Sequence, residues 1–197
     1  MSMTQHSTAI ARSMVVTPPV TEPLTIHEAK RHVELAASNT DHDSLLLQYI
    51  TAAREQFERD TTQCFVAREL QLKTANVRDG MRLPDRPVTA ITSIRFYPST
   101  TIETLSTDIY ELDASTSTVR LKYNQVWPSW SERWDAWEIN YTAGEHTDST
   151  TVPAIAKQAM LLYVGYLFRG NRGDDDRVND LRAYEALVAR HQRSTYP

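Results

Sequence analysis

The period of the hydrophobic pattern changes twice along this chain of 197 residues, and no other feature constrains its fold as strongly. Between residues 24 and 62, and again between 152 and 192, apolar residues recur every three or four positions, as on one face of an amphipathic helix. From 63 to 146, short segments instead alternate in part between apolar and polar residues, as strands do. We therefore expect an α+β fold, a small bundle of about four helices with a β-rich insertion between the second and third.

The first helical region is expected to be a helical hairpin. Thr25 and Glu28 have the spacing of a capping box, which marks the start of one helix. Asp43 is expected to cap the second helix. Residues 1–23 are rich in Ser, Thr and Pro, so we expect an extended arm that is disordered alone and is ordered by a partner subunit.

The insertion should contain about five short strands joined by polar turns. Its clearest strand is "WEINYTAG", in which Trp137, Ile139 and Tyr141 face one way and the intervening polar residues face the other. Gly144 closes this strand.

The region 152–192 should supply the two C-terminal helices that complete the bundle, followed by a tail at 193–197. Its first helix is apolar enough to suggest a membrane anchor. However, the apolar run from Ala154 to Phe168 is interrupted by Lys157 and Gln158 and is shorter than the roughly 20 residues that a spanning helix needs. We expect a core helix, a soluble protein and no membrane partner.

Composition excludes several kinds of site. The formal net charge of −4 disfavours sequence-independent DNA binding, which needs a basic excess. A single cysteine, Cys64, excludes an internal disulfide and a cysteine-rich zinc site. The 5 glycines form no phosphate-binding loop.

Three motifs suggest chemistry only weakly. His27 and His32 are five residues apart and so point roughly 140° apart around a helix, whereas a zinc pair needs a four-residue step. Cys64, beside Phe65 at the start of a strand, has the character of a packing residue rather than a nucleophile. The acidic clusters, Asp41 with Asp43 and Asp174–Asp176, are typical of helix caps, with a divalent cation and a metal-dependent hydrolase as the alternative.

All 4 tryptophans lie within one short segment, "WPSWSERWDAW", at positions 127, 130, 134 and 137. Core packing is the first interpretation. A protein–protein anchor is the second, because Trp dominates interface hot spots. The third is a nucleic-acid-binding module in which Trp127–Trp137 stack on bases with Arg133, although Glu132, Asp135 and Glu138 would repel phosphate.

The order of the motifs resembles the head–tail connector family of tailed phages and phage-like gene transfer agents, also called adaptor or head-completion proteins. The resemblance runs from about Pro23 to Gly173 and includes "LTIHEAKRHVEL", "LLLQYITAAREQFERDT", "LPDRPVTAITSIRFY", "WEINYTAG" and "VPAIAKQAMLLYVGYLFRGNRG". Its best markers are the L-P-x-x-P-V turn, the Y-T-A-G strand end and the V-P-x-x-x-K-Q-A helix start.

This resemblance implies a structural virion protein made in the bacterial host cytoplasm and located at the head–tail interface. It implies a homo-oligomeric ring of about a dozen copies, with the portal protein above and a tail terminator, stopper or other tail protein below. Double-stranded DNA would pass through the ring without specific binding, and no catalysis, cofactor or metal is expected. We expect the tryptophans and the C-terminal segment 190–197 to form interfaces with other subunits or partners, and the C-terminal segment to reach toward the portal. The expected interface residues are Trp127, Trp130, Trp134, Arg190, Arg193 and Tyr196.

Overall fold

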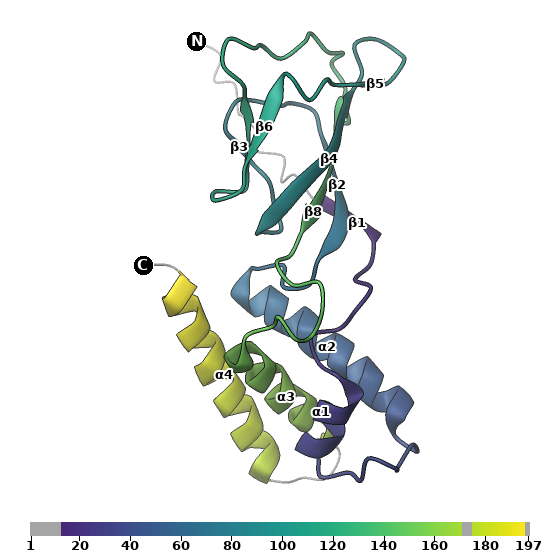
Figure 1. Ribbon diagram of the computed structural model, residues 1–197, viewed down its shortest axis with the longest axis vertical. Coiled ribbons are helices and arrows are strands. Elements are labelled where there is room, and N and C mark those ends of the chain that lie inside the picture. Colours follow the sequence, from purple (N-terminus) through teal and green to yellow (C-terminus); the bar gives the residue numbers. More distant parts are fainter. Residues whose placement is uncertain (1–12, 171–174, 196–197) are drawn as a thin grey trace, which may run out of the picture. The chain divides into compact units, whose positions relative to one another are not determined.

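The structure is a computed structural model that describes residues 13–170 and 175–195, with the side chains of 175, 176 and 193–195 left out. These residues form four helices and two antiparallel sheets (Figure 1). In the order of the chain, most of the strands come after the second helix and before the third. The expected α+β class, with a bundle interrupted by a β-rich insertion, is therefore confirmed. Seven of the eight strands in the described residues lie in the insertion, where about five were expected, because the sequence pattern does not reveal the shortest ones.

The chain divides into two compact units. One, here the strand unit, comprises residues 13–18 and 68–143. The other, the helical unit, comprises 19–67 and 144–195. It contains all four helices: α1 (Ile26–His32), α2 (Asp43–Thr61), α3 (Ala154–Phe168) and α4 (Asp175–Thr195).

Helix α1 begins as its sequence predicts. The Glu28 backbone N–H donates to the Thr25 hydroxyl at 3.2 Å, and the Thr25 N–H donates to the Glu28 carboxylate at 2.7 Å, which completes the capping box. The Lys157 ammonium also binds Glu28, at 2.7 Å, so the start of α1 is tied to α3.

The prediction that Asp43 caps α2 is wrong. The N-cap is His42, which makes no side-chain cap hydrogen bond, and Asp43 is already the first helical residue. Its carboxylate lies 2.6 Å from the ammonium of Lys30, a buried residue of α1. The competing ion pair therefore explains why Asp43 does not cap the helix, while its charge still suits the positive end of the α2 dipole.

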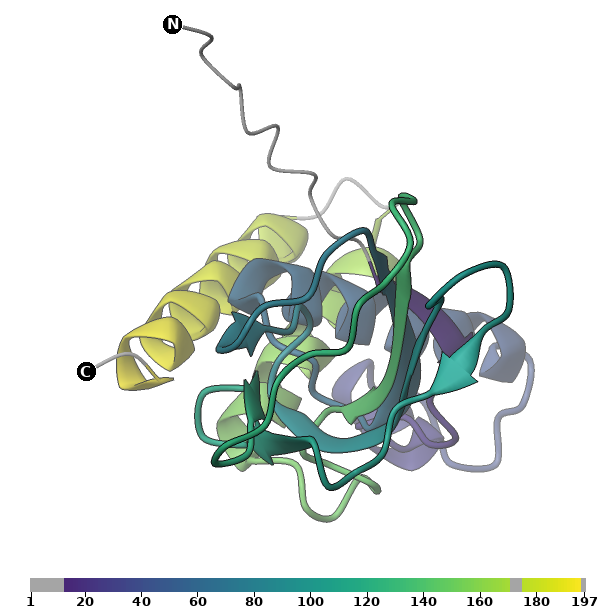
Figure 2. The ribbon, with the colours of Figure 1, turned by 90° about the horizontal axis from the view of Figure 1, so that it is seen from above.

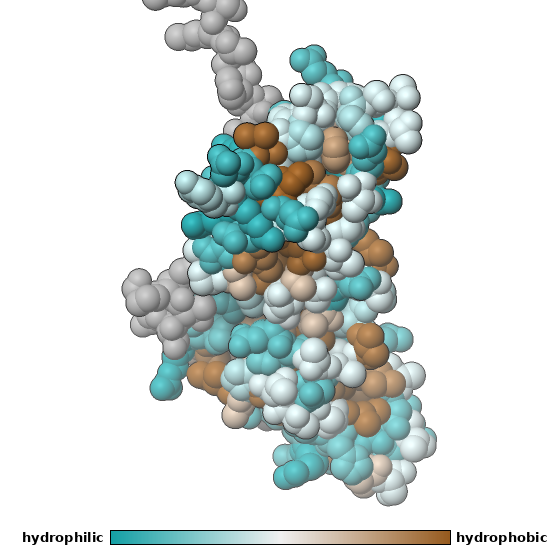
Figure 3. Space-filling model, turned by 45° about the horizontal axis from the view of Figure 1, so that its top comes forward, coloured by the Kyte–Doolittle hydropathy of each residue, from teal (hydrophilic) through white to brown (hydrophobic). Residues whose placement is uncertain are grey.

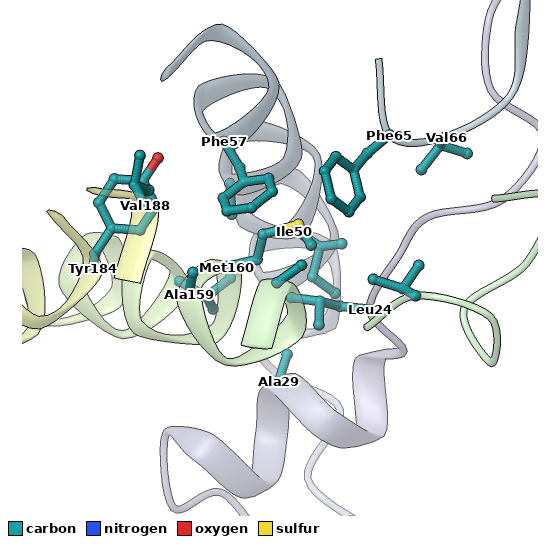
Figure 4. Packing of buried hydrophobic residues seen from close by; sticks show 14 of the residues in the cluster. Leu24, Ala29, Ile50, Phe57, Phe65, Val66, Ala159, Met160, Tyr184 and Val188 are labelled. Atoms are coloured by element: carbon teal, nitrogen blue, oxygen red, sulfur yellow. The ribbon is translucent and has the colours of Figure 1, made fainter. Parts of the chain in front are cut away.

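The helical unit has one apolar core. Figure 4 shows Phe57 of α2 next to Phe65, and the two rings meet edge to face with centroids 4.9 Å apart. Met160 and Ala159 of α3 enter the same cluster, and Tyr184 and Val188 of α4 close one side. Helix α3 is thus a core helix, as expected. In the residues that the structure describes, no helix is long and apolar enough to cross a membrane.

Gly165 lets other helices approach α3 closely. A Cβ at this position would lie 2.9 Å from an Asp180 carboxylate oxygen and 3.1 Å from the His32 ring nitrogen Nε2. Asp180 belongs to α4 and His32 to α1, so one small residue in α3 admits side chains from both helices.

The strand unit contains a five-stranded sheet in the order β1-β2-β8-β4-β5 and a three-stranded sheet in the order β3-β7-β6. Strands β4 and β8 lie side by side in Figures 1 and 2 and are paired from Val88↔Ala143 to Phe96↔Trp137. The bounds are β1 (Ser13–Thr17), β2 (Arg68–Thr74), β3 (Met81–Arg82), β4 (Val88–Phe96), β5 (Glu103–Thr104), β6 (Tyr110–Asp113), β7 (Thr118–Leu121) and β8 (Trp137–Ala143).

Strand β8 has the two faces that its alternation predicts. Trp137, Ile139 and Tyr141 are completely buried. On the opposite face, Glu138 is also buried, but it is paired with Lys73 of β2 and Arg95 of β4. One face is therefore stabilised by apolar packing, and the buried carboxylate on the other is satisfied by ion pairs.

Part of the segment expected to be an arm forms an edge strand. Residues Ser13–Thr17 pair antiparallel with β2, from Ser13↔Leu72 to Thr17↔Glu69. The Ser and Pro content around this segment concealed a strand that β2 stabilises. The rest of the expected arm includes residues 1–12, which lie outside the described residues.

The chain leaves and re-enters the helical unit at one place. Ala67 N–H donates to the His146 carbonyl at 2.9 Å, and His146 N–H donates to the Phe65 carbonyl at 3.0 Å. Gly144 has a φ of +105°, and a Cβ there would lie 2.5 Å from the carbonyl carbon and oxygen of Val66. The outgoing and returning segments are thus in backbone contact, and only glycine fits this conformation without displacing main-chain atoms.

We expect Gly144→Ala to lower the free energy of unfolding of the helical unit by about 3 kcal/mol or more, since backbone strain and a main-chain clash act together. Circular dichroism at 222 nm during urea unfolding reports this unit, which contains all four helices.

Gly80→Ala is the matched control. Gly80 also has a positive φ, +70°, but a Cβ added there would meet no heavy atom within 4 Å. Its cost should be only about 1 kcal/mol. Tryptophan fluorescence during urea unfolding measures this cost, because Gly80 and every tryptophan lie in the strand unit. Equal losses for the two variants would show that the contact at Gly144 is not tight.

Candidate interaction surface

The tryptophan segment is a loop that ends in a strand. Residues 122–136 connect β7 to β8 without forming a helix, and Trp137 begins β8. The buried Trp137 ring stacks on Phe96 with centroids 5.1 Å apart. Trp127 and Trp130 meet the same ring edge to face, at 5.6 and 5.4 Å. Three of the four tryptophans therefore form an aromatic cluster with Phe96 within the strand unit.

Hydrogen bonds attach this loop to the segment that follows β4. Tyr97 N–H donates to the Ala136 carbonyl at 3.0 Å, and Ser131 N–H donates to the Tyr97 carbonyl at 2.8 Å. The Ser131 hydroxyl donates to the Ser99 carbonyl at 2.9 Å. A loop without regular secondary structure is thus held at several backbone positions.

Arg133 is engaged within the same loop. Its guanidinium lies 3.9 Å above the Tyr97 ring centroid and donates two hydrogen bonds to Asp135. Those hydrogen bonds lower the pKa of the Asp135 carboxyl below its usual range and raise that of Arg133. Arg133 is therefore committed to intrachain contacts and is not displayed for a phosphate.

Trp134 differs from the other tryptophans because 74% of it is exposed. The same loop exposes Val126 at 76% and Tyr123 at 98%. We call Tyr123, Val126 and Trp134 the loop surface. Exposed apolar residues are common singly, but a tryptophan carried on an anchored loop is the kind of side chain that dominates binding at protein interfaces.

Strand β1 displays a second set of apolar residues. Met14, Val15 and Val16 are 56%, 55% and 55% exposed, and among the described residues β1 pairs with β2 alone. This edge was not predicted from the sequence. Its signal was the run of three apolar residues before Pro18, since adjacent apolar residues in a strand face opposite sides and cannot both face one core. Figure 3 shows that hydrophobic residues reach the surface of one face in separate patches.

The structure locates most of the expected interface residues. Trp127 and Trp130 are half-buried against Trp137, and Arg190 is exposed on α4. The side chain of Arg193 and the whole of Tyr196 lie outside the described residues. The structure thus brings Trp127 and Trp130 together in the aromatic cluster and leaves Trp134 exposed.

The residues of the weaker chemical motifs do not come together to form a site in the described part of the chain. His27 is exposed, while His32 is half-buried and its pKa is lowered, mainly by burial. Cys64 is buried, with Sγ 3.5 Å from the Val66 carbonyl. Within residues 13–170 and the described side chains of α4, no group of three His, Cys, Asp or Glu residues could hold a metal ion. The proposed cation ligands at 174–176 lie outside the described side chains.

We expect Trp134→Ala to change the free energy of unfolding of the strand unit by no more than about 0.5 kcal/mol, because an exposed side chain loses little burial. Trp130→Ala should cost about 2 kcal/mol, since it removes an edge-to-face contact and half-buried apolar area. Urea unfolding followed by the fluorescence of the remaining tryptophans, all in the strand unit, measures both. If Trp134→Ala is the more destabilising variant, this side chain belongs to the monomer's packing and not to an interaction surface.

Comparison with known proteins finds likeness in structure and not in sequence. No family model matches the chain, and no curated protein sequence matches it. Among solved structures, a chain from the virion of a native gene transfer agent particle matches with a TM-score of 0.71 and 23% identity, over 90% of this chain and 93% of that one.

Two further matches are chains from particle necks. One, from the neck of an empty gene transfer agent particle computed with C6 symmetry, has a TM-score of 0.69 and 22% identity over 83% of this chain and 86% of that one. The other, from the neck of a native particle computed with C12 symmetry, has a TM-score of 0.65 and 20% identity, covering 84% and 85%. This chain therefore shares its fold, over nearly its whole length, with components of gene transfer agent particles.

Proposed function

We propose that this chain is a structural protein of the neck of a phage-like particle, where it acts as the head–tail connector. The observation that carries the proposal is the match in fold over 90% of this chain and 93% of a gene transfer agent virion chain. This correspondence includes both units. The order of the sequence motifs independently supports the same family.

The proposed assembly is a closed ring of about a dozen copies. Each copy in such a ring presents two different surfaces, one to each neighbour. The strand unit offers two separate candidates, the loop surface and the apolar edge of β1. The neck structures with related folds were computed with C6 and C12 symmetry, which is consistent with a ring of this size.

The proposed ring lies between the portal protein above and a tail terminator, stopper or other tail protein below. Double-stranded DNA passes through its channel. The net charge of −4 suits a channel through which DNA must slide, because retention by counterion release needs clustered Lys and Arg. In this proposal, the C-terminal end, beginning near Arg190, contacts the portal, and the protein performs no catalysis.

The nucleic-acid-binding alternative has less support from the tryptophan geometry. Stacking on bases needs free aromatic faces, whereas Trp127 and Trp130 pack on Trp137 and Arg133 is bound to Asp135 and Tyr97. Trp134 alone does not make a platform. Absence of DNA binding by the purified chain at low salt would remove this alternative.

Deletion of the gene from a strain that produces particles should yield separate heads and finished tails in electron micrographs. Expression of the wild-type chain should restore joined particles. Trp134→Ala should restore about tenfold fewer, because loss of a central tryptophan removes an interface hot spot while the fold persists.

Leu47→Ala is the matched control. Leu47 is an apolar residue of α2 that is 51% exposed, and its substitution should restore joined particles normally. Intact tailed particles in the deletion strain would contradict the connector role itself. Normal joining with Trp134→Ala would contradict only the use of the loop surface.

A further inference from the structure

A pocket of about 470 Å³ opens on the surface of the helical unit between α2, α3 and α4. Three tyrosines line it, Tyr163 and Tyr166 of α3 and Tyr184 of α4. The ring centroids of Tyr163 and Tyr184 are 5.1 Å apart, and those of Tyr163 and Tyr166 are 5.5 Å apart. The rings are inclined by 50° and 41°, so they form a curved aromatic wall and not a parallel stack.

Carboxylates supply the charge of this pocket. Asp60 of α2 and Glu185 of α4 belong to its lining, and the described lining residues include no Lys or Arg. The Tyr184 hydroxyl donates to Asp60 Oδ2 at 2.6 Å, and the Gln56 amide donates to both Asp60 oxygens at 2.9 and 3.0 Å. Asp60 is therefore held in place by neutral donors, while its sequence neighbour Arg59 contributes positive charge nearby.

Two tyrosines of this wall have raised pKa values. Burial raises the pKa of Tyr163, Tyr166 and the Asp60 carboxylate raise it further, and Arg59 acts in the opposite direction. The pKa of Tyr184 is likewise raised, first by burial and then by its hydrogen bond to Asp60. Burial is the larger cause of both shifts, and the contribution of Asp60 shows only that its carboxylate acts on these two rings.

Two arginines lie near the pocket without filling it. The Arg177 guanidinium is 4.7 Å from the Tyr166 ring centroid, with Nη2 3.2 Å from the Tyr166 hydroxyl. Arg59 donates from Nη1 to Gln56 Oε1 at 3.1 Å. The first contact shows that a tyrosine of this wall already accepts a guanidinium on its face.

We infer that this pocket binds a basic side chain, arginine or lysine, that projects from a partner protein. Aromatic faces attract a cation through their quadrupole, and Asp60 and Glu185 supply charge-assisted acceptors. These carboxylates would repel an anionic occupant, and a purely apolar one would give Asp60 no partner beyond Tyr184 and Gln56. The inference does not rest on the proposed function, because it follows from the chemistry of the lining alone.

Methyl NMR of the full chain tests the inference without any substitution. Leu181 and Val188 line the pocket, so their ¹³C-labelled methyl groups report occupancy. Titration with N-acetyl-arginine methylamide should shift these signals, as should the lysine analogue. The citrulline analogue has nearly the same shape as the arginine analogue but no charge, and should bind about tenfold more weakly or not at all. Equal shifts with citrulline, or none with arginine or lysine, would overturn the inference.

Asp60→Asn should weaken arginine binding about tenfold, because an amide keeps the size and an acceptor for Tyr184 but removes the charge. Glu111→Gln removes one charge from β6 in the strand unit and should leave binding unchanged. If the two variants bind equally, Asp60 does not recognise the cation.

Arg193→Ala identifies the source of the cation. Arg193 follows Gln192, another lining residue, along the chain. Arginine binding that is unchanged in this variant supports a partner as the source. Binding that appears only in this variant would show that the chain fills its own pocket, and the proposal of a partner would then be wrong.

Discussion

The buried Glu58 carboxylate organises the place where the chain leaves the helical unit. Glu58 Oε1 accepts the backbone N–H groups of Phe65 and Val66, at 2.8 and 3.3 Å, while Oε2 accepts from Arg54 at 3.1 Å. Arg54 is itself buried and also binds Glu22, at 2.8 Å. One charged network thus joins the segment before α1, the middle of α2 and the exit toward β2.

This network explains how a bundle can be interrupted by a large insertion. The exit segment is held by Glu58, and the returning segment pairs with it through the backbone hydrogen bonds of His146. Because the two ends of the insertion meet, α3 can begin beside the core that α1 and α2 started. Removing one partner from a buried charge network is strongly destabilising. The path of the chain out of the helical unit and the packing of its four helices therefore depend on the same few side chains.

The sequence pattern was sufficient for the elements whose burial follows a simple period. The Thr25–Glu28 box, the two faces of β8 and the core character of α3 are each local properties of the chain. Strand β1 could not be identified in this way, because its existence depends on pairing with β2, more than 50 residues away. Asp43 was misassigned for the same reason, since a lysine of another helix determines its contact.

The candidate interaction surface shows the same limit, because spacing alone could not separate Trp134 from the tryptophans that pack on Trp137. The tyrosine pocket was hidden more completely, since the whole insertion separates α2 from α3 and α4, the other two helices of its lining.

The two units present different binding chemistry. The strand unit exposes apolar side chains on an anchored loop and along a sheet edge, and contact there depends on shape and on release of water. The helical unit offers an aromatic pocket with carboxylates, where contact depends on charge. A subunit of a ring that also joins other proteins needs contacts that discriminate among partners. In the proposed assembly, apolar surfaces that contact neighbouring copies and a pocket that binds a cation could not readily substitute for each other, and this difference would keep neighbouring copies and other partners on separate sites.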